Sequence, residues 1–203
     1  LVGAKPIYVD IDPKTYNIDP LQLEAAITKQ TKAIMPVSLY GQMPDMEAIN
    51  AIAKKHNIPV IEDAAQSFGA TYKNQKSGSL TVACGTSFFP AKPLGAYGDG
   101  GAIFTNDDSM AKVIKEIREH GSESRYYHTR LGLNARLDTI QCAILLSKME
   151  RYDWEFQQRQ VIAERYTQAF SNIKAEGFST PFVAENHKSA WAQYTITVKD
   201  RTN

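Results

Sequence analysis

The chain has 203 residues, and its 23 lysines and arginines nearly balance its 22 aspartates and glutamates, so the formal net charge is +1. A protein that binds nucleic acid or another polyanion would show a basic excess or a basic stripe, so this balance argues against that class. With 43% hydrophobic and 22% charged residues, the composition is that of a globular protein and not of a disordered one.

The first third of the chain alternates between strand and helix patterns. Three short runs are predicted to be strands: residues 6–11, 33–39 and 59–63. One helix is predicted to begin at Pro20 with Asp19 as its N-cap, and a second to follow Asp45 and end near His56. Strands alternating with helices in this way are typical of a parallel sheet with right-handed crossovers.

The pattern changes after about residue 80, where glycine becomes frequent. The elements expected there are strands at 82–89 and 102–105, a helix from about 108 to 120, a loop at 122–134, a helix at 137–170 and a strand at 194–198. The glycine-rich segment 90–101 joins the first two of these strands. The long helix is expected to lead from a sheet domain into a smaller C-terminal one.

Metal-binding and membrane patterns are missing from the sequence. The two cysteines form no CxxC pair and the four histidines have no ligand spacing, so no metal is expected. No run of about 18 apolar residues and no signal-peptide pattern occurs, so we expect a cytoplasmic protein with no membrane partner. Because the chain opens on Leu1 and ends abruptly at Asn203, we also expect it to be an internal piece of a longer protein.

Asp63 stands in the run Glu62-Asp63-Ala64-Ala65-Gln66, at the carboxyl end of a buried strand. In open α/β sheets, ligands bind outside the carboxyl ends of the strands, so a carboxylate there can reach a cofactor ring. The alternative is that Asp63 only caps the turn after the strand.

Lys92 stands in the run Ser87-Phe88-Phe89-Pro90-Ala91-Lys92-Pro93, between an apolar strand and the glycine-rich segment. Most lysines are solvated surface residues. A lysine held where water is limited has a lowered pKa, and its neutral amine can attack a carbonyl. A lysine of that kind, paired with a carboxylate that protonates a pyridine nitrogen, is what pyridoxal 5'-phosphate (PLP) chemistry requires, and Ser87 could hold a phosphate oxygen.

These motifs, followed by Gly98-Asp99-Gly100-Gly101 and by Gly132-Leu133-Asn134-Ala135-Arg136-Leu137-Asp138, resemble the DegT/StrS group of PLP-dependent nucleotide-sugar aminotransferases. The resemblance covers nearly the whole chain. It implies an α/β type I aminotransferase-like fold, with a mostly parallel sheet, flanking helices and the start of a smaller C-terminal α+β domain. It also implies a homodimer with a shared active site.

The resemblance assigns roles to individual residues. Lys92 would form the Schiff base with PLP and act as the acid/base, and Asp63 would pair with the pyridine nitrogen. Gln66 would lie against the ring near its 3-hydroxyl, and Ser87 would contact the cofactor phosphate. Asn134 would reach that phosphate from the neighbouring subunit, although it could also serve only to end a loop.

The loop around residues 125–130 is where substrate contacts are expected, since arginines, a histidine and tyrosines suit a diphosphate and a sugar carboxylate. The candidate substrate-binding residues are His128, Arg130, Arg136 and Tyr194. The alternative is a solvated basic loop. With Trp191-Ala192-Gln193-Tyr194, the loop is similar to the branch that aminates a UDP-linked 3-keto-N-acetylglucosaminuronic acid.

The resemblance thus implies transfer of an amino group from an amino acid, with glutamate as the expected donor, to a keto nucleotide sugar in polysaccharide biosynthesis. Two alternatives stay open: a sugar dehydratase of the same fold, which has histidine at the Lys92 position, and a non-catalytic regulatory or binding relative. The expected division is residues 1–136 for part of the PLP-binding domain, 137–170 for a connecting helix and 171–203 for the start of the small domain.

Overall fold

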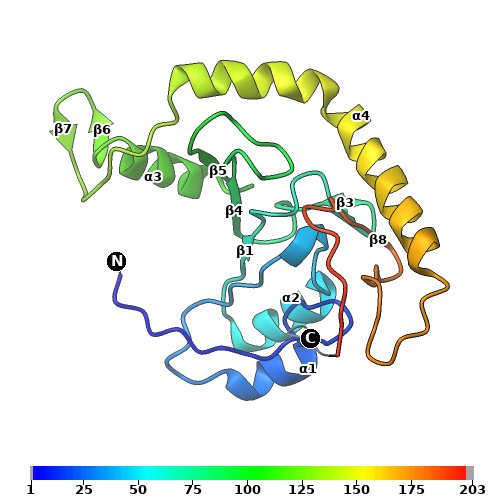
Figure 1. Cartoon of the computed structure of the whole chain (residues 1–203). Coiled ribbons are helices and arrows are strands. Elements are labelled where there is room, and N and C mark those ends of the chain that lie inside the picture. The colour runs from blue at the N-terminus through cyan, green and yellow to red at the C-terminus, as the bar shows by residue number, and fades with distance from the viewer. Residues whose placement is uncertain (1, 200–203) are drawn as a thin grey trace.

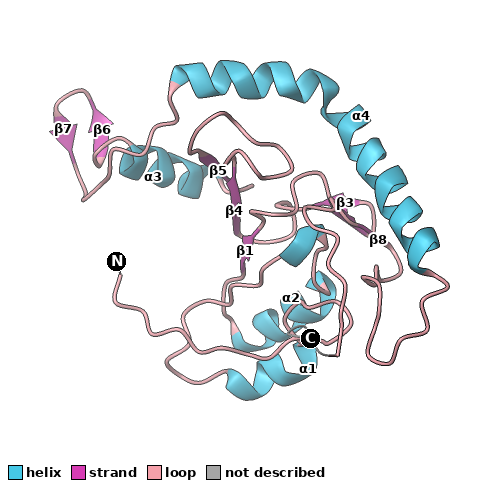
Figure 2. Ribbon diagram, viewed as in Figure 1, coloured by secondary structure: helices cyan, strands magenta, loops and turns pink. Residues whose placement is uncertain are grey.

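The computed structural model describes residues 2–199, and Figures 1 and 2 show the arrangement of its elements. The helices are α1 (Pro20–Leu23), α2 (Met46–His56), α3 (Asp108–Arg118) and α4 (Thr139–Phe170). The strands are β1 (Ile61–Asp63), β2 (Thr71–Tyr72), β3 (Gln75–Lys76), β4 (Ala83–Ser87), β5 (Gly101–Phe104), β6 (Ser122–Ser124), β7 (Tyr127–His128) and β8 (His187–Lys188). None of the described helices is both long and apolar enough to cross a membrane.

The sheet that carries the site has the order β1-β4-β5. Strands β1 and β4 are parallel, whereas β5 runs antiparallel to β4, so the sheet is mixed. On the outer side of β1, isolated parallel bridges join Ile34 to Val60 and Val37 to Asp63. These bridges continue the parallel pairing by one more segment, as the strand–helix alternation predicts.

Three of the predicted strands are wrong: in the structure these runs make only isolated bridges. The run at 33–39 makes only those two bridges, because Pro36 has no backbone N–H to donate to the ladder. Its carbonyl still accepts a hydrogen bond from Asp63 N at 2.9 Å. The run at 6–11 makes one bridge, from Ile11 to Ile18, and the run at 194–198 makes one, from Thr197 to Ser179. Their β-branched residues fit a strand, but no neighbouring strand pairs with them along the described chain.

The helix boundaries predicted from capping residues are confirmed. The Asp19 carboxylate accepts from Leu21 N at 2.9 Å at the start of α1, and Asp45 accepts from Ala48 N at 3.1 Å at the start of α2. Helix α2 then buries Met46 and Ile49 in the core beside the sheet. The apolar face fixes the helix against the sheet, and the caps fix where each helix begins.

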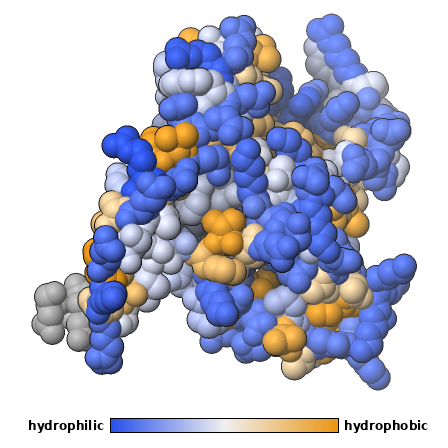
Figure 3. All heavy atoms as spheres, turned by 90° about the vertical axis from the view of Figure 1, so that its right-hand side faces the viewer, coloured by the Kyte–Doolittle hydropathy of each residue, from blue (hydrophilic) through white to orange (hydrophobic). Residues whose placement is uncertain are grey.

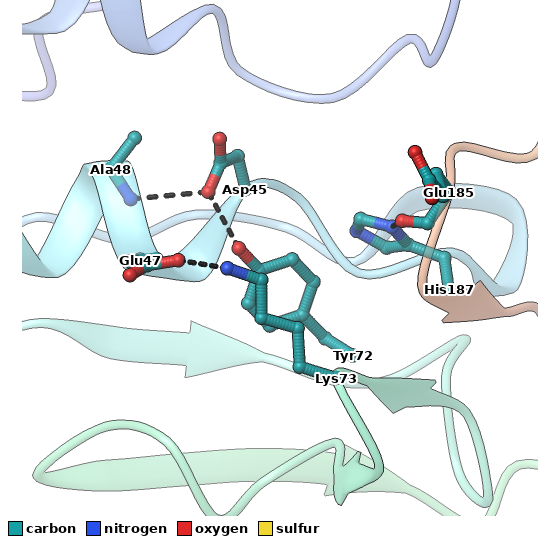
Figure 4. Close-up of polar contacts among 7 residues, drawn as sticks. All are labelled: Asp45, Glu47, Ala48, Tyr72, Lys73, Glu185 and His187. Atoms are coloured by element: carbon teal, nitrogen blue, oxygen red, sulfur yellow. Dashed lines mark hydrogen bonds and ion pairs between the residues drawn. The ribbon is translucent and has the colours of Figure 1, made fainter.

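The C-terminal segment returns to lie beside β2, whose Tyr72 in turn reaches the start of α2 (Figure 4). Tyr72 in β2 donates to the Asp45 carboxylate at 2.9 Å, and its ring meets the His187 imidazole edge-on at a centroid distance of 4.7 Å. Burial, together with the Asp45 bond, raises the pKa of Tyr72. Strand β8 pairs antiparallel with β2, so residues on either side of α4 are joined in one small sheet.

Helix α4 bends around one side of the molecule (Figure 1). Tyr152 donates to the Phe68 carbonyl at 2.5 Å and is 7% exposed, so the middle of α4 is fixed to the turn after β1. The side of the molecule formed by its second half is largely hydrophilic, with apolar side chains in separate patches (Figure 3). The division into residues 1–136, 137–170 and 171–203 stays a prediction.

Below the sheet, Glu62 is buried as a carboxylate, at 1% exposure. It accepts from Ser38 Oγ at 2.7 Å, from Ser77 Oγ at 2.6 Å and from Gly78 N at 2.7 Å. Its neighbour across the ladder is Cys84, and burial, with a smaller contribution from the Glu62 charge, raises the pKa of that thiol to about 12. The two serine hydroxyls and the backbone N–H that donate to Glu62 compensate for the hydration that its carboxylate loses on burial.

Replacing Glu62 by alanine leaves these three donors without their acceptor, so we expect Glu62→Ala to lower the free energy of unfolding by about 3 kcal/mol. Glu62→Gln keeps one acceptor oxygen and should be less destabilising. Urea unfolding of the full-length protein measures both. Glu47→Gln, which removes a carboxylate that is 69% exposed, is the control and should change little. A Glu62→Ala midpoint equal to that of the control would contradict this prediction.

Candidate active site

Asp63, Gly85 and Ser87 lie on one face of the β1-β4 ladder. Asp63 pairs in register with Gly85, and side chains alternate along a strand, so Ser87 shares the face of Gly85 while Glu62 and Cys84 share the other. A Cβ built on Gly85 would meet no heavy atom within 4 Å, which shows that this face is open beside Asp63. The carboxylate and the hydroxyl thus flank an open space at the carboxyl edge of the parallel pair.

The capping interpretation of Asp63 is confirmed, and its role toward a cofactor stays a prediction. Its Oδ1 accepts from Ala65 N at 3.0 Å, so it does cap the turn after β1. The side chain is half-buried, and its other oxygen accepts no hydrogen bond from residues 2–199. One oxygen fixes the carboxylate and the other remains available to a ligand.

Lys92 lies in a tight turn that follows β4. Lys92 N donates to the Phe89 carbonyl at 2.9 Å, and Phe89 N donates to Ser87 Oγ at 3.2 Å. Gly95 closes the turn, because a Cβ there would lie 2.4 Å from the Pro90 carbonyl oxygen. The Lys92 side chain is half-buried, and among the described residues its Nζ has no hydrogen-bond or ion-pair partner. The backbone that carries Lys92 is therefore fixed by the turn, and no acid among the described residues pairs with its amine.

Two residues that the sequence did not single out hold the segment after Lys92. Gln141 Oε1 accepts from Tyr97 N at 2.9 Å, and Lys148 Nζ donates to the Gly95 carbonyl at 2.5 Å. The Lys148 ammonium also lies 5.2 Å from the centroid of the Tyr97 ring. Their spacing is the sequence signal that could have identified them. Gln141 and Lys148 are seven residues apart, so they lie on the same face of α4 as the buried Leu145.

Gln66 lies one turn beyond Asp63. Its Oε1 accepts from Tyr40 N at 2.6 Å, so the side chain links the turn after β1 to the end of the neighbouring parallel segment. The amide group keeps its two N–H donors, as contact with a ring hydroxyl would need.

The remaining candidates lie on other parts of the molecule. Asn134 and Arg136 contact each other at 3.2 Å, and His128 Nδ1 lies 3.1 Å from the His120 carbonyl. Arg130 pairs with Glu116. The Tyr194 hydroxyl lies 2.8 Å from Thr167 Oγ1, beside the end of α4. Within residues 2–199, no hydrogen bond or ion pair joins any of these residues to Asp63 or Lys92. The β6–β7 hairpin lies at the opposite end of the molecule from the end of α4 (Figure 1).

The residues at the sheet edge suit PLP as a ligand. The cofactor needs a carboxylate for its ring nitrogen, a hydroxyl for its phosphate and a lysine for its aldehyde. Asp63 and Ser87 offer the first two groups beside the open face at Gly85, and Lys92, in the turn that follows β4, offers the third. The fold and this edge together define the class of the PLP-dependent aminotransferases.

The chain belongs to the DegT/DnrJ/EryC1/StrS aminotransferase family, whose family model matches residues 1–203. It is 60% identical, over 99% of its length, to the UDP-2-acetamido-2-deoxy-3-oxo-D-glucuronate aminotransferase of Pseudomonas aeruginosa. It is 52% identical, over 98% of its length, to a pleiotropic regulatory protein of Geobacillus stearothermophilus. Among solved structures, S. venezuelae DesV in complex with a ketimine intermediate is similar at a TM-score of 0.94 and 35% identity, over 98% of this chain.

The chain spans about half the length of these relatives: 55% and 54% of the two proteins and 53% of the solved chain. The predicted type I aminotransferase fold is confirmed by the structural likeness over nearly all of this half.

We expect the segment after Lys92 to loosen when its contacts with α4 are removed. Gln141→Ala and Lys148→Met each delete one hydrogen bond to this segment, so the peptide 94–97 should exchange its amide hydrogens about tenfold faster in each variant. Hydrogen–deuterium exchange read by mass spectrometry measures this. Lys115→Met changes an exposed lysine on α3 and should leave the peptide unchanged. Equal exchange in all variants would contradict the role given to α4.

Proposed function

We propose that the full-length protein is a PLP-dependent aminotransferase that moves an amino group from an amino acid, glutamate, to a keto nucleotide sugar. The observation that carries the proposal is the placement of Asp63 and Ser87 beside the open face at Gly85, with Lys92, which has no side-chain partner among the described residues, in the turn that follows β4. The 60% identity to an aminotransferase for a UDP-linked 3-oxo sugar supports a substrate of that class. Biosynthesis of a cell-surface polysaccharide is the process that we propose for the product.

The residues divide the work by their chemistry. Lys92 would hold the cofactor and afterwards move a proton to and from the carbon that carries the exchanged nitrogen. Asp63 would hold a proton on the ring nitrogen, Gln66 would donate to the ring hydroxyl, and Ser87 would donate to the phosphate. When bound, PLP supplies an electron sink for the carbon whose proton is removed. The capping bond to Ala65 keeps the Asp63 carboxylate oriented while it does this.

A second copy of the chain is part of the proposal. Within the described part of its own chain, Asn134 makes no hydrogen bond to the sheet edge, and we propose that it reaches the phosphate of the neighbouring subunit in a homodimer. Apolar side chains around it are open to solvent: Leu131 is 97% exposed, Leu133 56% and Ile140 68%. Apolar surface of this kind is typical of contact surfaces between proteins. We further propose that the dimer works in the cytoplasm.

The sugar nucleotide would be bound by side chains of the same hairpin region. His128, Arg130 and Arg136 offer donors to a diphosphate or to a sugar carboxylate. Tyr194 would act from the segment beside α4. We propose a UDP-linked 3-keto-N-acetylglucosaminuronic acid as the acceptor, since all these groups suit an anionic sugar.

Lys92→Ala should reduce sugar amination at least about a thousandfold, because the variant loses both the covalent hold on the cofactor and the proton carrier. The assay offers the full-length protein PLP, glutamate and a panel of keto nucleotide sugars, and mass spectrometry reads the products. Lys115→Ala is the matched control and should keep wild-type turnover. Undiminished turnover of Lys92→Ala would overturn the mechanism, and a product that has lost water without gaining nitrogen would indicate the dehydratase.

Asp63→Asn separates charge from structure at the ring nitrogen. The amide oxygen can still accept from Ala65 N, so the urea midpoint should stay near the wild-type value. The negative charge is lost, and turnover should fall about a hundredfold or more. Unchanged turnover would exclude Asp63 from the role, whereas a large fall in the urea midpoint would show that its cap is its main contribution.

A further inference from the structure

The hairpin region at residues 120–136 is tied at both ends to the last turn of α3. Leu133 N donates to the Ile117 carbonyl at 2.7 Å, and His120 N donates to the Leu133 carbonyl at 2.9 Å. Ala135 N donates to the Arg118 carbonyl at 3.0 Å. The incoming and outgoing chains of the hairpin region therefore share one base.

Two glycines let the chains at this base approach closely. A Cβ on Gly121 would lie 1.7 Å from the Arg130 carbonyl oxygen, and one on Gly132 would lie 2.0 Å from Gly121 N. No other residue fits at either place without a backbone shift. The base of the hairpin region thus has a fixed backbone, but this does not fix the side chains that it carries.

One side chain at the base is held by a buried charge. Glu116 in α3 is 6% exposed, and its Oε2 lies 2.6 Å from Arg130 Nε. Lys112 Nζ lies 3.8 Å from its other oxygen. Within residues 2–199, Oε2 accepts no hydrogen bond of good geometry, so the attraction between the charges holds the pair. A buried carboxylate that loses its cation is strongly destabilised, which ties Arg130 to α3.

The contact uses only one of the donor positions of Arg130. The ion pair runs through Nε, and the two terminal nitrogens contact no partner among the described residues. Those terminal nitrogens form the planar fork that suits phosphate and carboxylate groups. A free arginine side chain of this length would sample many rotamers, and the Glu116 contact selects one of them.

We propose that Glu116 is a positioning residue that holds Arg130 by Nε, so that the terminal nitrogens are presented to the phosphate or carboxylate of the acceptor substrate. This inference rests on the proposed function. It deepens that function by making the orientation of Arg130 depend on a residue of α3 that touches no substrate.

The test is a double-mutant cycle in the full-length protein: Glu116→Gln, Arg130→Gln and the double variant. We expect Glu116→Gln to raise the KM for the keto nucleotide sugar about tenfold, with kcat within about twofold and the rate of the glutamate half-reaction unchanged. In the Arg130→Gln background, adding Glu116→Gln should change this KM by less than about twofold, because the two residues act as a unit. The matched control is Glu123→Gln, which removes an exposed ion pair with Lys112 at 3.2 Å, and it should leave the KM unchanged.

The outcomes separate the two proposals. The positioning role would be overturned if the two single changes raised the KM by factors that multiply in the double variant. A wild-type KM in Glu116→Gln would overturn it as well. Neither result would affect the aminotransferase activity itself. A wild-type protein that aminates no keto nucleotide sugar would overturn the proposed function, and with it the substrate-facing role of Arg130. If Glu116→Gln fails to fold, a comparison of Arg130→Lys with Arg130→Gln gives the second measure, because lysine has no Nε to pair with Glu116. A KM that lysine restores to the wild-type value would overturn the inference. A KM that stays raised in Arg130→Lys would support it.

Discussion

The hydrogen bonds to the buried Glu62 carboxylate fix the edge of the sheet on which the candidate site is built. Ser38 ends the parallel segment beside β1, and Ser77 and Gly78 belong to the turn that precedes β4, so one carboxylate joins three parts of the chain. Because side chains alternate along a strand, fixing Glu62 below the sheet also fixes Asp63 above it. The orientation of the carboxylate proposed for the cofactor therefore depends on a neighbour that faces the other way.

Rigidity at Lys92 comes from a different part of the chain. The turn after β4 closes on itself through Gly95, but its outer side is held by Gln141 and Lys148 of α4. A group that must hold a cofactor and move a proton has to keep its place to within a fraction of an ångström. The middle of α4 is fixed in turn, through Tyr152, to the turn after Asp63. Helix α4 thus connects the two strand ends that carry the carboxylate and the lysine.

Sequence patterns were enough for the starts of α1 and α2, because capping signals are local. Asp19 and Asp45 cap helices within three residues of themselves, whereas the roles of Asp63, the last residue of β1, and of Lys92, in the turn after β4, stay predictions. The run at 6–11 failed because strand formation needs a partner: Tyr8 is 89% exposed. Contacts such as Lys148 with Gly95, 53 residues apart, follow from tertiary packing that no local pattern contains.

The buried carboxylates of Glu62 and Glu116 are held by different kinds of contact, so the sheet edge and the hairpin region differ in rigidity. Glu62 is satisfied by neutral donors that are themselves part of the fold, so its bonds persist as long as the sheet does. Glu116 relies on Arg130, which is 40% exposed, and on a lysine that is 65% exposed. Salt screens attraction to exposed cations, but it reaches buried hydrogen bonds far less. The sheet edge proposed for the cofactor is therefore held by contacts that salt hardly affects. Arg130, proposed to meet the substrate, is held by an electrostatic attraction that solvent and a competing anion can weaken.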